Sequence, residues 1–106
     1  MRIDILTVVP ELLESPLGHS IVQRAKNKGL VEIHIHDIRE YGKGNYHQVD
    51  DYSYGGDAGM ILMIEPIYTL INKLKQEREY DEIIYMSPDG KVLDQPIANR
   101  LSCMEN

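Results

Sequence analysis

The first apolar pattern along the chain is that of a β-strand covered on both faces. In the second half of residues 1–9, Ile5 and Thr7 would lie on one face and Leu6 and Val8 on the other. A strand that is apolar on both faces is typical of the centre of a parallel sheet with helices on either side. We therefore expect this first strand to be a central one.

Three further segments have the composition of strands. Residues 31–37 alternate between aliphatic and polar side chains, which predicts a strand with one face on the core. Residues 60–64 form a short apolar stretch, and residues 82–86 are wholly apolar or aromatic from Ile83 onward. Such a continuous apolar run predicts another strand buried inside the sheet.

Helical patterns separate these strands. Residues 11–14 suit one short turn, and a longer helix should begin at a capping box formed by Ser20 and Gln23 and end at Gly29. Another helix should start at Pro66, with apolar residues at the spacing i, i+3, i+4 and i+7, namely Ile67, Leu70, Ile71 and Leu74. Asp94 should cap the last helix. The alternation of strands and helices predicts an α/β fold with a largely parallel sheet flanked by helices.

Composition places this fold in a single soluble domain. The 106 residues are 42% hydrophobic and 26% charged, which is typical of a globular protein of modest core. We expect no membrane contact, because no apolar run is long enough to span a bilayer and the first residues open a strand rather than a signal peptide. The single cysteine, Cys103, fits a reducing cytoplasm. A net charge of −6 argues against indiscriminate nucleic-acid binding but is compatible with a local basic patch.

The segment from His47 to Met60 combines residues that a solvated loop has little reason to collect. Gly55, Gly56 and Gly59 allow left-handed backbone and the close approach of another molecule, and a pair of aspartates precedes them. This composition favours a functional loop, although a long surface turn is made of the same residue types. The spacing matches no phosphate-binding fingerprint, so it does not identify a ligand.

Two smaller motifs carry weaker signals. His34 and His36 would share the polar face of the strand over residues 31–37, but no third ligand stands at a recognisable spacing, and we predict no metal site. Residues 87–90 read Ser-Pro-Asp-Gly and follow the expected strand over residues 82–86, at the end of a strand where open α/β sheets bind ligands. An ordinary turn has the same composition.

Four motifs follow one another in a fixed order. They are Met1-Arg2-Ile3-Asp4-Ile5-Leu6-Thr7, then Ser20-Ile21-Val22-x-Arg24-Ala25, then Gln48-Val49-Asp50-Asp51-x-x-Tyr54-Gly55-Gly56-x-Ala58-Gly59-Met60, and finally Ser87-Pro88-x-Gly90. Together they closely resemble the amino-terminal part of the bacterial tRNA (guanine-N1)-methyltransferase family, over essentially the whole chain. The third motif is the most specific. One departure is Asp57, where the family usually has a third consecutive glycine.

The resemblance implies both a fold and a reaction. The fold would be the trefoil-knotted, SPOUT-type α/β methyltransferase fold, a rare exception to the absence of knots in proteins. The reaction transfers a methyl group from S-adenosylmethionine to N1 of the guanine immediately 3′ of the anticodon in tRNA, in a cytoplasmic homodimer. Because family members are more than twice as long, residues 1–106 would form the amino-terminal part of the cofactor-binding domain. The knot-closing segment and the carboxy-terminal tRNA-binding domain would be absent, and the fragment would be inactive alone.

The resemblance also assigns roles to particular residues. The cofactor-binding residues, which would contact S-adenosylmethionine mainly through their backbone, are Tyr85, Met86, Ser87, Pro88 and Gly90. The substrate-binding residues, which would line the site of the target guanine, are Gly55, Gly56 and Gly59. Asp50 would support catalysis, since the family's general base lies beyond this chain. A magnesium requirement is a further expectation of the family, without a recognisable site in this sequence.

Two other interpretations of the residues stay open. The chain could be a non-catalytic dimerisation or cofactor-binding module that is complete as it stands, which an in-frame continuation of the gene after Asn106 would exclude. An ordinary nucleotide-binding α/β domain is less favoured, because no glycine fingerprint follows the first strand.

Overall fold

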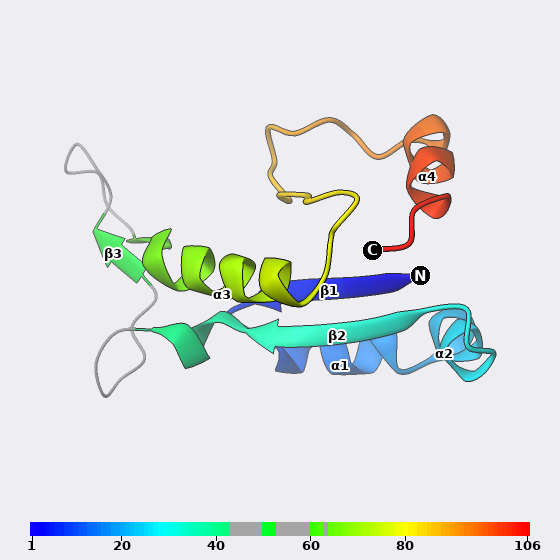
Figure 1. The fold of residues 1–106 in the computed structure, drawn as a ribbon, viewed down its shortest axis with the longest axis horizontal. Helices are drawn as coiled ribbons and strands as arrows, with labels where there is room; N and C mark the ends of the chain where they lie inside the picture. The colour runs from blue at the N-terminus through cyan, green and yellow to red at the C-terminus, as the bar shows by residue number, and fades with distance from the viewer. Residues whose placement is uncertain (43–49, 53–59, 63) are drawn as a thin grey trace.

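The computed structural model describes most of the chain as strands, helices and short connections (Figure 1). The described residues are 1–42, 50–52, 60–62 and 64–106.

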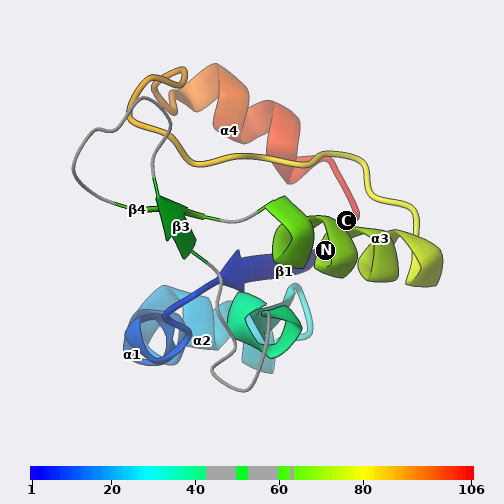
Figure 2. The ribbon, with the colours of Figure 1, turned by 90° about the vertical axis from the view of Figure 1, so that its left-hand side faces the viewer.

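A parallel pair of strands lies at the centre of the fold. Strand β1 (Arg2–Thr7) pairs with β2 (Glu32–Asp37) over the full length of both. Helices α1 (Glu11–Leu17) and α2 (Ser20–Asn27) form the crossover between them, as a parallel pair requires. Both helices lie on the same side of the two strands in two perpendicular views (Figures 1 and 2).

The second half of the chain covers the other side of this pair. A 3₁₀ helix, η1 (Ile38–Tyr41), follows β2 directly. The short strands β3 (Asp50–Tyr52) and β4 (Met60–Leu62) then form an antiparallel pair of their own. Helix α3 (Ile64–Glu77) lies on the face of the β1–β2 pair opposite α1, and α4 (Gln95–Ser102) lies beyond it (Figure 2).

The described core is small and lies between α3, η1 and the end of β1. Its buried members are Ile38, Leu70 and Leu74, with partly buried side chains packed around them, namely Leu6, Val8, Tyr41, Ile67 and Tyr80. Leu70 and Leu74 belong to the apolar face that the spacing predicted for this helix, so that prediction is confirmed. Each buried leucine contributes about 2 kcal/mol through the hydrophobic effect.

Helix ends follow the sequence signals at Gly29 and Asp94. Gly29 has a φ of 73° and ends α2 as expected, because the left-handed conformation suits glycine. Leu30 N–H donates to the Ala25 carbonyl across this turn at 3.0 Å. Asp94 caps α4 by accepting a hydrogen bond from Ile97 N–H at 3.0 Å. Helix α3 begins at Ile64, two residues before the predicted start, so Pro66 lies in its first turn, where its missing N–H costs nothing.

The predicted capping box of α2 does not form. The chain enters the helix from His19, which has extended backbone, so Ser20 is the first helical residue and its side chain makes no cap. Ser20 has a φ of 57°, an uncommon conformation for a residue with a Cβ. The side-chain amide of Gln23 instead donates to Asn27 at 2.8 Å, one helical turn away.

The strand predicted over residues 82–86 is also wrong for this structure. This segment belongs to no strand, and Ile83, Ile84, Tyr85 and Met86 are all exposed. A strand needs a neighbour to complete its backbone hydrogen bonds, and none pairs with this segment in the described part of the chain. For the same reason β1 is not seen in the central position that its pattern predicted, since its one described strand neighbour is β2.

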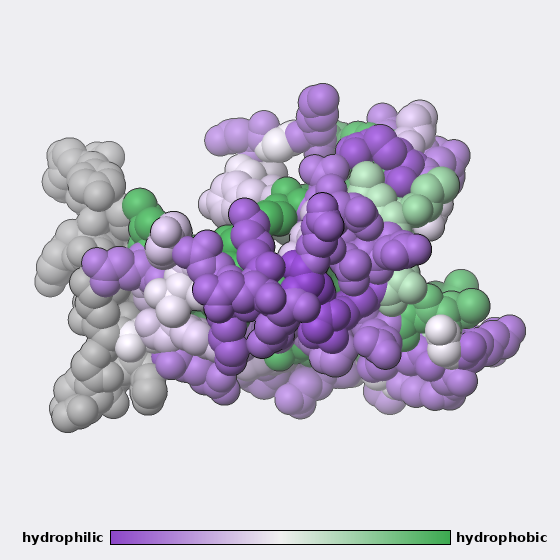
Figure 3. All heavy atoms as spheres, in the orientation of Figure 1, coloured by the Kyte–Doolittle hydropathy of each residue, from purple (hydrophilic) through white to green (hydrophobic). Residues whose placement is uncertain are grey.

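The surface mixes polar and apolar groups. Hydrophilic side chains cover most of the face shown in Figure 3, with smaller hydrophobic patches between them. Outside the residues left undescribed, no helix has both the length and the apolar composition needed to cross a bilayer.

The core position of Leu70 gives the first prediction. Leu70→Ala should lower the free energy of unfolding by about 2–5 kcal/mol, because it removes buried methyl groups and leaves a cavity. The control is Ile64→Ala on the same helix, where the side chain is 76% exposed and the change should stay within about 0.5 kcal/mol. Urea denaturation followed by circular dichroism measures both. Equal effects of the two substitutions would contradict the core described above.

Candidate functional site

The site residues predicted from the sequence form two groups, the substrate group around residues 50–59 and the cofactor group at residues 85–90. Gly55, Gly56 and Gly59 lie outside the described residues. Asp50 is described in its backbone, as the first residue of β3, where it pairs with Leu62 of β4. The antiparallel pairing therefore sets Asp50 close to the start of α3.

The second group forms a tight turn at the end of an exposed segment. Gly90 N–H donates to the Ser87 carbonyl at 3.1 Å, and Asp89 N–H donates to Ser87 Oγ at 3.3 Å. A side chain on Gly90 would bring its Cβ to 3.2 Å from the Ser87 carbonyl oxygen, so the turn leaves little room there. Ser87 is half-buried, whereas Tyr85 and Met86 are 86% and 85% exposed.

The backbone before this turn is available to a ligand. Residues 83–86 make no hydrogen bond to any other described residue, and their side chains face solvent. Unpaired backbone of this kind offers both donors and acceptors, which can recognise the polar edge of a base.

The two groups of predicted residues do not meet within the described chain. Strand β3 lies at one end of the long axis, whereas the segment that leads from α3 to α4 lies above the middle of the molecule (Figure 1). The structure thus brings the five predicted cofactor residues together in one segment and leaves Asp50 apart from them.

A cluster that the sequence did not indicate lies where this segment begins. Asp4 of β1 accepts four hydrogen bonds from three side chains. Arg2 donates through Nε and Nη2 at 3.0 and 3.1 Å, the Tyr80 hydroxyl donates at 2.6 Å, and His36 Nε2 lies 2.7 Å from Asp4 Oδ1. The Asp4 side chain is only 3% exposed. We call Arg2, Asp4, His36 and Tyr80 the Asp4 cluster.

The cluster keeps the Asp4 carboxyl ionised. Burial alone would raise its pKa, but the hydrogen bonds from Arg2, Tyr80 and His36 outweigh burial and hold the pKa of Asp4 well below its ordinary range. A carboxylate can only accept hydrogen bonds, so His36 must carry its proton on Nε2. Burial, together with the hydrogen bond to Asp4, raises the pKa of Tyr80 to about 12.

The register of the sheet explains why sequence reasoning missed this cluster. The alternation of residues 31–37 placed His36 on a solvated face, whereas its side chain is half-buried against Asp4. In the parallel register Asp4 lies opposite His34, so His36 is two residues along on the same face. The one signal in the sequence was a carboxylate between the apolar residues Ile3 and Ile5.

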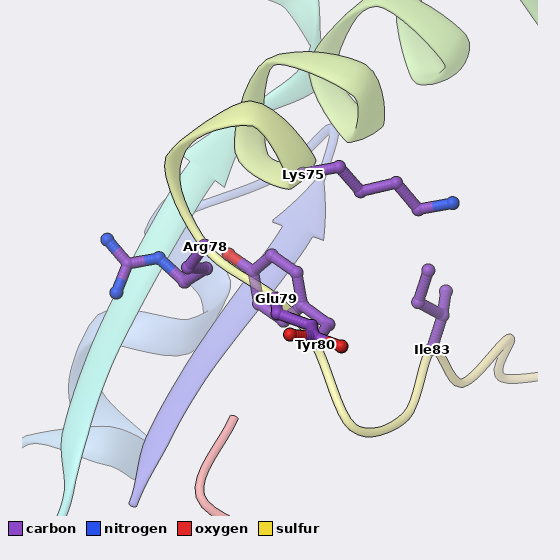
Figure 4. A pocket seen from close by; sticks show the side chains of 5 residues that line it. All are labelled: Lys75, Arg78, Glu79, Tyr80 and Ile83. Carbon is purple, nitrogen blue, oxygen red and sulfur yellow. The ribbon is translucent and has the colours of Figure 1, made fainter.

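A shallow hollow of about 380 Å³ lies beside Tyr80, at the end of α3 (Figure 4). Its lining residues are Lys75, Arg78, Glu79, Tyr80 and Ile83. The Lys75 and Arg78 side chains point to opposite sides, and Arg78 Nε is buried without a hydrogen-bond partner in the described chain. Ile83, which lies at the start of the exposed segment, forms one wall of the hollow.

Comparisons with known proteins cover the whole chain. The sequence profile of the family described as tRNA (Guanine-1)-methyltransferase TrmD matches residues 1–106. Proteins named tRNA (guanine-N(1)-)-methyltransferase from Christiangramia forsetii and Flavobacterium johnsoniae are 61% and 59% identical to the chain over all 106 residues. The chain spans 47% of the length of each of these relatives.

A solved structure supports the same relationship. The crystal structure of tRNA (m1G37) methyltransferase from Aquifex aeolicus matches with a TM-score of 0.76 and 30% sequence identity. The match covers 95% of this chain and 45% of the other. The α/β class predicted from the alternation of strands and helices is therefore confirmed, and the fold is of the SPOUT type.

The low pKa of Asp4 predicts a dependence of stability on acid. A depressed folded-state pKa contributes stability that is present above the unfolded-state value, about 3.9, and is lost as the pH falls through the folded-state value. Wild type should therefore lose stability steadily below about pH 4, and Asp4→Asn should lack this part of the pH dependence while costing about 2 kcal/mol at neutral pH. Urea denaturation across this range measures both quantities. Asp89→Asn, in the exposed turn, serves as the control, and a pH profile for Asp4→Asn that matches its profile would contradict the role of the cluster.

The raised pKa of Tyr80 predicts a change at the alkaline end. A folded-state pKa of about 12 means that the stabilising contribution of Tyr80 is complete below the ordinary tyrosine value, about 10, and is lost as the pH rises through 12. An absorbance titration of the phenol groups should show a component near pH 12 that disappears in Tyr80→Phe. Persistence of that component in the variant would show that it belongs to another tyrosine.

Proposed function

Because the chain belongs to the tRNA (guanine-1)-methyltransferase family, we propose that residues 1–106 carry the first half of a methyl-transfer site. The reaction moves a methyl group from S-adenosylmethionine to N1 of the guanine immediately 3′ of the anticodon in tRNA. The observation that supports this proposal is the exposed segment ending in the tight turn from Ser87 to Gly90, whose backbone is open to a ligand.

The residues of that segment fit a nucleoside-type cofactor. Tyr85, Met86, Ser87, Pro88 and Gly90 would hold S-adenosylmethionine, mainly through backbone donors and acceptors. When bound, the cofactor supplies a methyl group on a positively charged sulfur. The lack of space for a side chain at Gly90 is consistent with a turn that must keep its shape beside a ligand.

The guanine would be presented to the methyl group by residues 53–59, which follow β3 in the sequence. Guanine N1 carries a proton that must leave as its lone pair forms the new bond, which a carboxylate base can accept. We propose that Gly55, Gly56 and Gly59 line the guanine site and that Asp50 supports it. The base itself would lie in the part of the longer protein that this chain does not span.

Several properties of the longer protein complete the proposal. We propose that it is a cytoplasmic homodimer with a trefoil knot, of which residues 1–106 form the amino-terminal part of the cofactor-binding domain. The share of the relatives that this chain spans, 47%, supports this division. A magnesium requirement has no support from the described residues, in which no group of three acidic, histidine or cysteine side chains could hold a metal.

The test of the cofactor site is calorimetric titration of the chain with S-adenosylhomocysteine. We expect binding, and we expect Gly90→Ala to weaken it by about tenfold, because the added Cβ would press on the Ser87 carbonyl and shift the turn. The control is Val92→Ala, which removes an 84% exposed side chain just beyond the turn and should leave the affinity unchanged.

Each outcome of this titration separates the functional interpretations. Binding without methyl transfer to a tRNA transcript fits the first half of a methyltransferase site. Methyl transfer by the 106-residue chain alone would contradict our division of the site. A lack of binding would place the cofactor pocket outside this chain, and a non-catalytic dimerisation module would then be the better interpretation if light scattering shows a dimer.

A further inference from the structure

The hydrogen bond between Tyr80 and Asp4 joins two residues that are 76 positions apart in the sequence. Tyr80 follows the end of α3 and comes five residues before Tyr85, so it lies where the chain turns from the helix into the exposed segment. Its ring packs against the core, and its hydroxyl reaches Asp4 on β1. In Figure 4 the Tyr80 ring lies between the end of α3 and β1.

Asp4 is a firm acceptor for this hydroxyl because its own position is fixed. Arg2 binds both carboxylate oxygens, an arrangement that restricts rotation as well as adding energy. His36 holds Oδ1 from the neighbouring strand at 2.7 Å. Since the side chain is nearly inaccessible to water, the four hydrogen bonds act in a medium of low polarity, where each is stronger than at the surface.

The residue after Tyr80, Asp81, binds the last two of the 106 residues. The Asp81 carboxylate accepts hydrogen bonds from the backbone N–H groups of Glu105 and Asn106 at 2.8 and 3.1 Å, and Asp81 N–H donates to the Asn106 carbonyl at 3.1 Å. Glu82 then pairs with Arg100 of α4 at 3.1 Å. Tyr80 is thus the direct side-chain contact between the beginning of the exposed segment and β1. Asp81 adds an indirect one through Glu105, whose carbonyl accepts a hydrogen bond from Arg2 N–H of β1 at 2.6 Å.

We propose that Asp4 and Tyr80 are positioning residues for the cofactor segment, residues 83–90. Their hydrogen bond fixes where the chain enters that segment, and neither side chain contacts the cofactor. The identity of the ligand rests on the proposed function, whereas the role of this hydrogen bond in placing the segment does not. The inference gives a role to a buried ionised carboxylate that the methyl-transfer site itself does not use.

The test compares two removals of a single hydroxyl group. Tyr80→Phe keeps the packed ring and deletes the donor to Asp4. Tyr68→Phe is the matched control, because Tyr68 is 66% exposed on α3. Backbone amide resonances of the chain are recorded for wild type and both variants, and each variant is titrated with S-adenosylhomocysteine under conditions where circular dichroism shows it to be folded.

We expect Tyr80→Phe to shift the amide resonances of residues 81–90. We also expect it to weaken the binding of S-adenosylhomocysteine by about tenfold, since a hydrogen bond to a charged group is lost. Tyr68→Phe should do neither. A purely structural role for Tyr80 would lower the urea midpoint while leaving the resonances of residues 81–90 and the affinity of the folded variant unchanged, and this result would overturn the inference. Unfolding of Tyr80→Phe under conditions where Tyr68→Phe stays folded would overturn it as well.

A second variant separates this inference from the proposed function. Asp4→Asn weakens the acceptor rather than the donor, so it should shift the same resonances in residues 81–90, and Tyr80→Phe should add little to it. If wild type does not bind S-adenosylhomocysteine, the cofactor assignment fails, but the resonance comparison still decides the positioning role. If wild type binds and neither variant changes the affinity or the resonances, the positioning role fails and the cofactor assignment stands.

Discussion

The ionised carboxylate of Asp4 is the constraint to which the arrangement of the described elements is tied. A charge with so little exposure is tolerated only when hydrogen bonds replace the water it has lost. Those hydrogen bonds come from β1 itself, from β2 and from Tyr80, which lies shortly after the end of α3. Satisfying one buried group therefore fixes two strands and the exit of a helix relative to each other.

The apolar core acts together with this cluster rather than separately from it. Tyr80 belongs to both, because its ring packs near Leu70 and Leu74 while its hydroxyl binds Asp4. With three buried side chains in the described apolar core, the hydrophobic contribution is modest, and directional contacts carry a larger share of the specificity. The ring adds apolar packing to the core, and the hydroxyl adds a directional hydrogen bond to β1.

The exposed segment after Tyr80 has a strand-like composition but is not packed within the described chain. Ile83 to Met86 has the composition of a buried strand, yet its side chains face solvent and its backbone makes no bonds within the described chain. Such a segment is costly unless something covers it, because exposed apolar patches favour association. In the proposed methyltransferase, a cofactor and the remainder of the domain would provide that cover.

The sequence by itself determined the elements whose signals are local. The apolar face of α3, the glycine that ends α2, the aspartate that caps α4 and the turn at Ser87 all depend on neighbours within a few residues. Motif resemblance, confirmed over the whole chain, added the family. Only the tertiary structure decided that Asp4, His36 and Tyr80 meet, and that residues 82–86 stay unpaired. Both outcomes depend on which segments come to lie beside β1, and contacts between residues so far apart leave no periodic trace in the sequence.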